Sequence, residues 1–461
     1  MAHPSSSVKI INLCQVAPPL GSAPSTTLPL TFFDIPWLFC RPMERVFFYE
    51  YPYPTHHFIQ TILPTLKLSL SLTLQQFFPF ASNLICPPQP NKPHLLYVGG
   101  DAVSFTVAES TADFNHLVAN YPKDVNELHP FVPRLPLARV LDDGTRVVPL
   151  IAIQVTVLPN SGIAICVKFL HVAADGRAFH HFMKSWASIF RSKGDLTCIE
   201  NSLPFHNRAV VEDPIGLGPN FVKQWWNSGA SEYKEDANLL LVHDFLKNKV
   251  RATLLLGRTQ IEKLKHWVSK NESEAMVRTS TFVVTCAMMW VCWIKSEQST
   301  NNEQLCHFVL VADCRDRYGF SIPQTYFGNC LALCFVPLKR RELVAENGIV
   351  EAVKAIGNKV RELESEGVLR GAERWMLDWK EVMEQGHHLV TVAGSPKLDV
   401  YQTDFGWGRP KKSEAVQIDM SESMSIAESR DEKGGIEIGL ALERAQMDKF
   451  NSIYGNFLKV L

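Results

Sequence analysis

The stretch FLHVAADGRAF, residues 169–179, ends an apolar run with a histidine and passes through an aspartate and a glycine into a helical pattern. Before it, residues 150–157 alternate, with Ile151, Ile153, Val155 and Val157 on one face. The turn residues PNSG and a second strand-like segment, residues 163–170, follow, which predicts a β-hairpin. After it, one buried helical stripe is predicted by Phe179, Phe182, Met183, Trp186 and Phe190. His171 is therefore expected at the carboxyl end of a strand, just before a helix, where functional side chains are common.

An imidazole at such a place is a candidate general base, because its ordinary pKa of about 6.5 lets it accept a proton near neutral pH. Asp175, four residues after His171, has two open roles. It orients the imidazole as in a catalytic triad, or it faces away and pairs with a cation that pins the turn; the short turn favours the second role. The plain alternative is a satisfied histidine and an ordinary N-cap at Asp175. Gly176 is expected to let the backbone turn.

A second motif lies far along the chain in TDFGWGRPKK, residues 403–412. Asp404 comes first, and Gly406 and Gly408 flank a tryptophan, a spacing that permits positive φ and close backbone approach. Alone, this stretch reads as an aromatic turn. Together with the histidine motif, in this order and at this separation, it forms a specific pair.

Composition restricts the class of protein. The chain has 461 residues, 46% of them hydrophobic, and a formal net charge of -1. Two domains are expected at this length, and no basic field favours nucleic acid or an anionic membrane. Without an expected signal peptide or membrane helix, and with eleven cysteines scattered through apolar segments, we expect a cytosolic protein with reduced thiols.

Motifs for several other chemistries are missing. The sequence has no HExxH, GxSxG or GxxxxGK[ST], and the neighbours His180 and His181 would point apart on a helix. No metal site is therefore predicted, and serine-hydrolase and nucleoside-triphosphatase activities are disfavoured.

The order of strand-like and helix-like segments suggests α/β or α+β layering in both halves. Segment 205–235 mixes proline, glycine and charge without periodicity and is the predicted crossover linker between domains 1–204 and 236–461. In the second half, Thr259 is expected to cap a helix through Leu264 and Trp267.

The two motifs make the chain resemble the plant BAHD acyltransferases, which carry HxxxDG in the middle of the chain and DFGWG near the C-terminus. Both are intact here, at residues 171–176 and 404–408. LPLTFFDIPWL (28–38) and YFGNC (326–330) are similar to the branch that acylates anthocyanins and other flavonoid or phenolic glucosides. GSPKLDVYQTDFGWG (394–408) and ESRDEKGGIEIG (428–439) are most similar to its malonyltransferases.

The resemblance implies two chloramphenicol-acetyltransferase-like domains, each a mixed β-sheet with helices, joined by a long crossover loop, with a channel between them. It implies an acyl-CoA-dependent O-acyltransferase that moves a malonyl group to a sugar hydroxyl, the 6-hydroxyl, of a phenolic or flavonoid glucoside. The enzyme would be a monomer whose partners are malonyl-CoA as co-substrate and the glycoside, with no bound cofactor or acyl-enzyme. Two alternatives stay open: a hydroxycinnamoyl-CoA donor, and a non-catalytic protein that binds CoA or phenolics.

The resemblance also implies roles for residues of the two motifs. His171 would be the base, and Asp175 would point away from the channel and pair with Arg315 of ADCRDR. Asp404, with its glycines, would hold a loop away from the histidine on the CoA side. Trp407 would line the channel and offer its indole N–H to the oxyanion.

Phosphates and a malonyl carboxylate would need donors and cations. The candidates for the CoA phosphates are Ser280, Thr281, Ser395 and Lys397. Each is equally explained as a cap or a solvated charge. Arg177 is the candidate reader of the malonyl carboxylate, with an ordinary exposed arginine in a first helical turn as the alternative.

Overall fold

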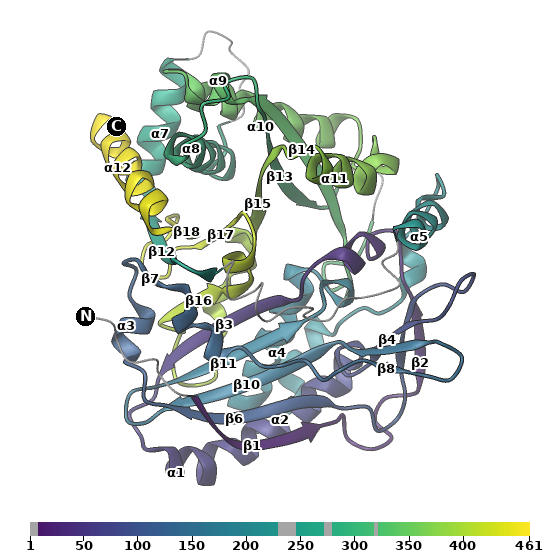
Figure 1. Cartoon of the computed structure of the whole chain (residues 1–461). Helices are drawn as coiled ribbons and strands as arrows, with labels where there is room; N and C mark the ends of the chain where they lie inside the picture. The colour runs from purple at the N-terminus through teal and green to yellow at the C-terminus, as the bar shows by residue number, and fades with distance from the viewer. Residues whose placement is uncertain (1–7, 229–245, 272–278, 318–320) are drawn as a thin grey trace.

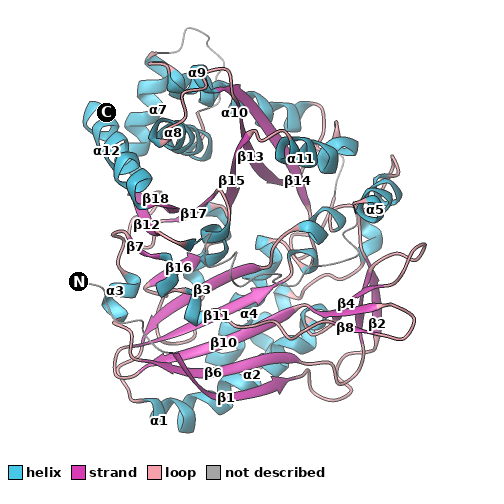
Figure 2. Cartoon of the chain, in the orientation of Figure 1, coloured by secondary structure: helices cyan, strands magenta, loops and turns pink. Residues whose placement is uncertain are grey.

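The computed structural model describes residues 8–228, 246–271, 279–317 and 321–461 (Figure 1). Its described part contains two large mixed sheets and one small sheet (Figure 2). The first large sheet has six strands, in the order β1 (Val8–Val16), β6 (Val103–Ser110), β10 (Ile151–Leu158), β11 (Gly162–Phe169), β3 (Met43–Glu50) and β16 (Lys412–Ala415).

The second large sheet is built mainly from the C-terminal half of the chain. Its seven strands run in the order β14 (Leu331–Lys339), β13 (Leu305–Asp313), β15 (His388–Ala393), β17 (Ser423–Glu428), β18 (Ile436–Glu443), β12 (Lys249–Leu256) and β7 (Lys123–Asp124). The small antiparallel sheet consists of β2 (Thr26–Pro29), β5 (His94–Tyr97), β4 (Asn83–Cys86), β9 (Arg146–Pro149) and β8 (Arg139–Val140). Each large sheet thus takes its last strand from the other half of the sequence.

The hairpin predicted around PNSG is confirmed. Strands β10 and β11 pair antiparallel from Ile151↔Phe169 to Leu158↔Gly162. β10 is buried along its whole length, as is β11 except for Lys168, because β6 and β3 flank the pair in the middle of the sheet. Because β11 is buried up to its last residue, Phe169, the residues that follow it begin in the protein interior.

Helices cover the sheets. In the described residues they are α1 (Thr55–His57), α2 (Leu63–Gln76), α3 (Phe114–Val118), α4 (Gly176–Arg191), α5 (Leu217–Asn227), α7 (Arg258–Lys270), α8 (Thr281–Ser296), α9 (Arg340–Val344), α10 (Gly348–Ser365), α11 (Trp375–Glu384) and α12 (Arg444–Val460). Helices α2 and α4 pack together on the first large sheet, with the predicted stripe of α4 buried except for Phe190. Helix α8 is almost wholly buried and contacts α7, α10 and α12. None of the helices in the described ranges has the length and apolar character needed to cross a bilayer.

The structure differs from the sequence analysis at the start of α7 and in the segment predicted as a linker. Thr259 is not the cap of α7: the helix begins at Arg258 after Gly257, whose N–H donates to Gln260 Oε1 at 2.9 Å. The N–H of Arg258 donates to Glu432 Oε1 at 2.8 Å, and Thr259 lies inside the first turn. Segment 205–235 contains the helix α5, and its residues 229–235 lie outside the described ranges. The boundaries at 204 and 236 stay a prediction.

Candidate active site

His171 stands where the sequence places it, between a strand and a helix. Strand β11 ends at Phe169, the 3₁₀ turn η6 (His171–Ala173) follows, and α4 begins at Gly176. His171 is buried, with 8% of its surface exposed. Its side chain lines a cavity of about 2110 Å³. The ring is therefore packed on most sides and open to one internal space.

This cavity takes its walls from both large sheets and from the helices above them. Aromatic and apolar side chains dominate part of the lining, including Trp37, Phe39, Leu331, Leu333, Trp375 and Met376. The volume exceeds the roughly 300–1,000 Å³ of an ordinary small-molecule pocket, which allows two sizeable ligands to be present at once.

A hydrogen-bond network fixes the protonation of the His171 ring. Nδ1 lies 3.1 Å from Asn329 Oδ1, while Asn329 Nδ2 donates to the backbone oxygens of His171 at 2.9 Å and Val172 at 3.2 Å. Because carbonyl oxygens only accept, the amide nitrogen must face them, which leaves Oδ1 toward the ring. Nδ1 of the neutral ring thus carries the proton. Nε2 keeps its lone pair and receives no hydrogen bond from a described residue.

The surroundings also keep the ring uncharged. Burial lowers the pKa of His171 below its usual value, and the nearby Asp175 carboxylate and the Asn329 hydrogen bond only partly offset this effect. Trp37 stacks on the imidazole with centroids 3.9 Å apart and ring planes 8° apart. The stacking thus holds the orientation of the imidazole, and burial keeps it neutral, as a proton acceptor must be.

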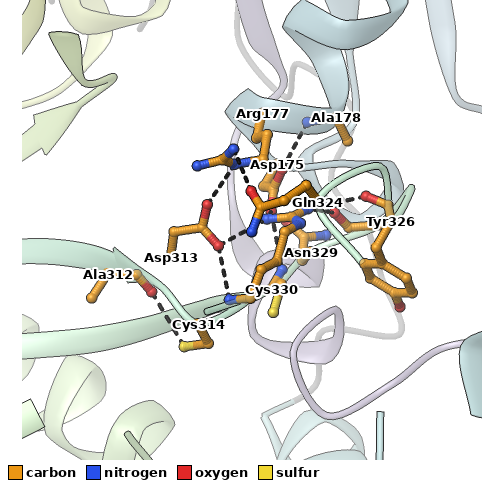
Figure 3. Close-up of polar contacts among 12 residues, drawn as sticks. Asp175, Arg177, Ala178, Ala312, Asp313, Cys314, Gln324, Tyr326, Asn329 and Cys330 are labelled. Atoms are coloured by element: carbon orange, nitrogen blue, oxygen red, sulfur yellow. Dashed lines mark hydrogen bonds and ion pairs between the residues drawn. The ribbon is translucent and has the colours of Figure 1, made fainter. Parts of the chain in front are cut away.

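Asp175 does not contact the imidazole. Its Oδ2 lies 2.8 Å from Arg315 Nη1. Oδ2 also accepts from the N–H of Cys330 at 3.1 Å, and Oδ1 accepts from the N–H of Ala178 at 2.9 Å (Figure 3). The side chains of Asp175 and Arg315 are each 1% exposed. Asp175 therefore caps α4 and forms a buried ion pair that ties the helix to the segment before β14.

Gly176 does not provide the sharp backbone turn that was expected of it. Its φ is not in the left-handed region, and it is the first residue of α4. A Cβ built at this position would lie 3.2 Å from Leu398 Cδ1, so the glycine leaves room for the 3₁₀ turn η10 (Pro396–Leu398). A side chain at this position would require a small shift of Leu398.

The second motif forms a loop beside the first sheet. Gly406 and Gly408 have φ of 92° and 85°, as their spacing predicted, and Asp404 Oδ1 accepts from the N–H of Gly406 at 2.6 Å. Trp407 is not among the described residues that line the cavity. It packs instead in an aromatic cluster with Tyr49, Tyr51, Phe190 and Phe405. The suggested contact between its indole N–H and an oxyanion is therefore wrong for this structure.

The candidates for the CoA phosphates do lie on the cavity wall: Ser280, Thr281, Ser395 and Lys397. Ser280 Oγ caps α8 by accepting from the N–H of Val283 at 3.3 Å, and Ser395 Oγ accepts from the N–H of Lys397 at 3.2 Å. The N-terminus of α8 thus opens on the cavity, a favourable place for a phosphate. Binding of CoA by these residues stays a prediction.

Arg177 also borders the cavity, but its charge is already engaged. Its Nε donates to Asp313 Oδ2 at 2.7 Å and its Nη1 to Gln324 Oε1 at 2.6 Å (Figure 3). Asp313 in turn lies 3.1 Å from Arg315, so the charges of Asp175, Arg315, Asp313 and Arg177 alternate in one chain. An incoming carboxylate would share this cation with Asp313.

Comparison with known proteins places this geometry in a family. The family model described as the transferase family matches residues 7–454. The chain belongs to the BAHD acyltransferases. It is 42% identical to coumaroyl-CoA:anthocyanidin 3-O-glucoside-6''-O-coumaroyltransferase 1 of Arabidopsis thaliana, over 98% of this chain and 97% of the relative. It is 39% identical to phenolic glucoside malonyltransferase 1 of Nicotiana tabacum, over 90% and 91%.

Solved structures confirm the mixed α/β fold predicted for a BAHD acyltransferase. The crystal structure of vinorine synthase matches with a TM-score of 0.67 at 17% identity, over 96% of each chain. The structure of F. sporotrichioides TRI101 complexed with coenzyme A and T-2 matches with a TM-score of 0.63 at 14% identity, over 92% of this chain and 97% of that one.

The sequence pattern missed three residues of this BAHD site: Asp34, Trp37 and Asn329. They lie within FFDIPW and YFGNC, segments that carried the resemblance to the anthocyanin branch but suggested no contact with His171. Asn329 is 158 positions from the histidine it contacts, and no spacing rule connects residues so far apart.

Proposed function

We propose that this BAHD acyltransferase moves an acyl group from a CoA thioester to a sugar hydroxyl of an anthocyanin or other phenolic glucoside. One observation carries the proposal: the imidazole of His171 presents Nε2, which receives no hydrogen bond from the residues that the structure describes, in a cavity large enough for both substrates. The acceptor class is supported by the relatives, whose names describe anthocyanidin glucoside and phenolic glucoside acyltransferases.

The residues suggest a direct transfer within a ternary complex. Nε2 of His171 accepts the proton of the sugar hydroxyl as its oxygen attacks the thioester carbonyl carbon. The tetrahedral intermediate collapses by breaking the C–S bond, and the imidazolium returns the proton to the CoA sulfur. The protein forms no covalent bond in this scheme, so the alignment of the two bound substrates supplies much of the acceleration.

For the acyl group, we favour a hydroxycinnamoyl donor. Arg177, the residue suggested to read a malonyl carboxylate, is already paired with Asp313. The relatives at 42% and 41% identity are both named coumaroyltransferases. The malonyl group predicted from the sequence is the second candidate: Arg177 lies on the cavity wall with its side chain 36% exposed, and the relative at 39% identity is a malonyltransferase.

The reaction and the donor are tested together. The purified protein is given equal amounts of coumaroyl-CoA and malonyl-CoA with an anthocyanidin 3-O-glucoside, and the products are weighed by mass spectrometry. We expect coumaroyl product, and a loss of kcat of about 10²-fold or more for His171→Ala. His181→Ala is the matched control, because this histidine is also on α4 but contacts Ser202 outside the cavity lining. Full turnover by His171→Ala would refute the base, and CoA binding without turnover of any donor would favour a binding protein.

Arg177→Gln separates the two donors. A charge pair with a malonyl carboxylate would be lost in this variant, which would raise the KM for malonyl-CoA about tenfold or more. The KM for coumaroyl-CoA should change less than about threefold, since that donor offers no carboxylate. Predominant malonyl product from the wild type, with this KM effect, would overturn our choice of donor.

A further inference from the structure

The amide of Asn329 is held from behind by a buried carboxylate. Asp34 Oδ1 accepts from the backbone N–H of Asn329 at 3.0 Å and from its Nδ2 at 3.1 Å, and Asp34 has no exposed surface. Asp34 immediately precedes the 3₁₀ turn η1 (Ile35–Phe39), which carries the stacked Trp37. The same element thus touches the His171 ring directly through Trp37 and indirectly through Asn329.

The second oxygen of Asp34 is surrounded by donors. Oδ2 accepts from the N–H of Thr31 at 2.8 Å, from its Oγ1 at 2.7 Å and from Arg208 Nη1 at 2.7 Å. Arg208 is itself buried and lies over the ring of Tyr326, its guanidinium carbon 5.5 Å from the ring centroid. Both oxygens of Asp34 are therefore required as acceptors, which only the ionised carboxylate provides.

We propose that the buried Arg208–Asp34 ion pair is a positioning device for the acyl transfer: by accepting from the Asn329 amide, it keeps Asn329 Oδ1 on His171 Nδ1 and so keeps Nε2 free to accept a proton. The inference rests on the proposed function of His171. Arg208 and Asp34 touch neither the cavity nor a reacting atom. They act through Asn329, whose Nδ2 is held by Asp34 Oδ1 together with the backbone oxygens of His171 and Val172.

The consequence of reversing the amide is specific. With Nδ2 toward the ring, Asn329 would donate to Nδ1, which would then have to be the unprotonated nitrogen. Nε2 would carry the hydrogen and lose its ability to act as a base. A structural ion pair with no such role would lower stability when removed, yet leave the tautomer of the remaining folded protein unchanged.

Asp34→Asn tests this directly. The three donors at Oδ2 would hold the new amide oxygen, which turns the new NH₂ group toward the backbone N–H and the Nδ2 of Asn329. Two donors would then oppose this NH₂ group, which favours reversal of the Asn329 side chain against the backbone oxygens of His171 and Val172. We expect kcat to fall about 10²-fold or more, while the Kd for CoA, measured by calorimetry, and the KM for acyl-CoA stay within about threefold. ¹⁵N shifts of labelled histidine, assigned by comparison with His171→Gln, should move from the Nδ1–H to the Nε2–H pattern.

A second pair of variants covers the case in which Asp34→Asn does not fold. Arg208→Gln removes the counter-charge of Asp34 and should lower kcat about tenfold or more at unchanged KM. Arg208→Lys keeps the charge and should restore kcat to within about threefold. Arg340→Gln is the matched control, because Arg340 forms an ion pair of the same 2.7 Å with Glu297 and has the same 3% side-chain exposure. Its kcat should match the wild type.

Three results would overturn the proposal. They are wild-type kcat in folded Asp34→Asn or in Arg208→Gln, an unchanged histidine tautomer in an inactive variant, and an equal loss of kcat in Arg340→Gln. None of these results depends on the activity of His171→Ala. If that variant is inactive, they would refute the positioning role of the Arg208–Asp34 pair and leave the proposed function of His171 intact. An inactive wild type with every acyl-CoA would instead refute the function itself.

Discussion

Replacement of Asp175 distinguishes a carboxylate that supports the fold from one that serves the imidazole. Asp175→Ala removes the partner of Arg315 at 2.8 Å and the cap on the N–H of Ala178 at 2.9 Å. Asp175→Asn keeps an oxygen for the cap but loses the charge. Asp113→Ala is a control for the cap alone, because Asp113 caps α3 through two backbone N–H groups and forms no ion pair with a described residue.

The expected loss of stability follows from these contacts. Removing one partner of a buried ion pair costs about 3–5 kcal/mol, and losing an N-cap costs about 1 kcal/mol. Arg315 keeps Asp313 at 3.1 Å, so the value for the pair should lie near its lower end. We expect a loss of about 4 kcal/mol for Asp175→Ala, about 3 for Asp175→Asn and about 1 for Asp113→Ala. Since whole proteins are stable by only about 5–15 kcal/mol, the first two are large losses.

Urea unfolding followed by tryptophan fluorescence measures these differences, and activity is assayed in parallel at a temperature at which each variant is folded. A folded Asp175 variant should retain more turnover than His171→Ala, because the carboxylate does not contact the ring. The fold-supporting role of Asp175 is refuted if the stability of Asp175→Ala is within about 1 kcal/mol of the wild type while its kcat falls as far as that of His171→Ala. That result would make Asp175 the orienting member of a triad.

Two further predictions concern the site and its second loop. Burial lowers the pKa of His171 below 6.5, so the base stays neutral in weak acid. We therefore expect kcat/KM to fall only below pH 6.5. A midpoint above pH 7 in the pH–rate profile would contradict the buried environment of His171. Gly408 has φ of 85° and open space around it, so Gly408→Ala should destabilise by about 1–2 kcal/mol through backbone strain alone. Gly455→Ala, within α12 and equally unobstructed, should stabilise by about 0.5–1 kcal/mol in the same denaturation assay; equal effects of the two substitutions would refute the strain argument.

Local periodicity predicted the elements that deliver the histidine. The alternation of residues 150–157 and the turn residues PNSG predicted the β10–β11 hairpin, and the apolar stripe predicted α4, because both patterns depend on residues that are near neighbours. The start of α7 was misplaced at Thr259, since glycine offers no side chain to mark a cap and Gln260 supplies the acceptor instead. Helix ends depend on such individual contacts more than on periodicity.

The parts of the site that the sequence did not predict are those made by distant segments. The contact between His171 and Asn329, the support from Asp34 and the stacking of Trp37 join three stretches that nothing local brings together. Trp407 shows the converse: a motif residue near the C-terminus was expected in the channel, yet its neighbours Phe405 and Tyr49 draw it into an aromatic cluster. Membership in a motif indicated importance for the fold but not the direction of the side chain.

The exchange of edge strands between the two large sheets has a consequence for biosynthesis. Strand β3 (Met43–Glu50) is translated early, but its neighbour β16, which pairs Ser413 with Phe47, is translated only after residue 411. Until then, the edge of β3 that does not pair with β11 has unpaired backbone groups beside Val46, Phe47 and Phe48, a template for wrong pairing between nascent chains. Premature termination before residue 412 would therefore release a chain prone to aggregate, and chaperone demand should concentrate on this late interval of translation.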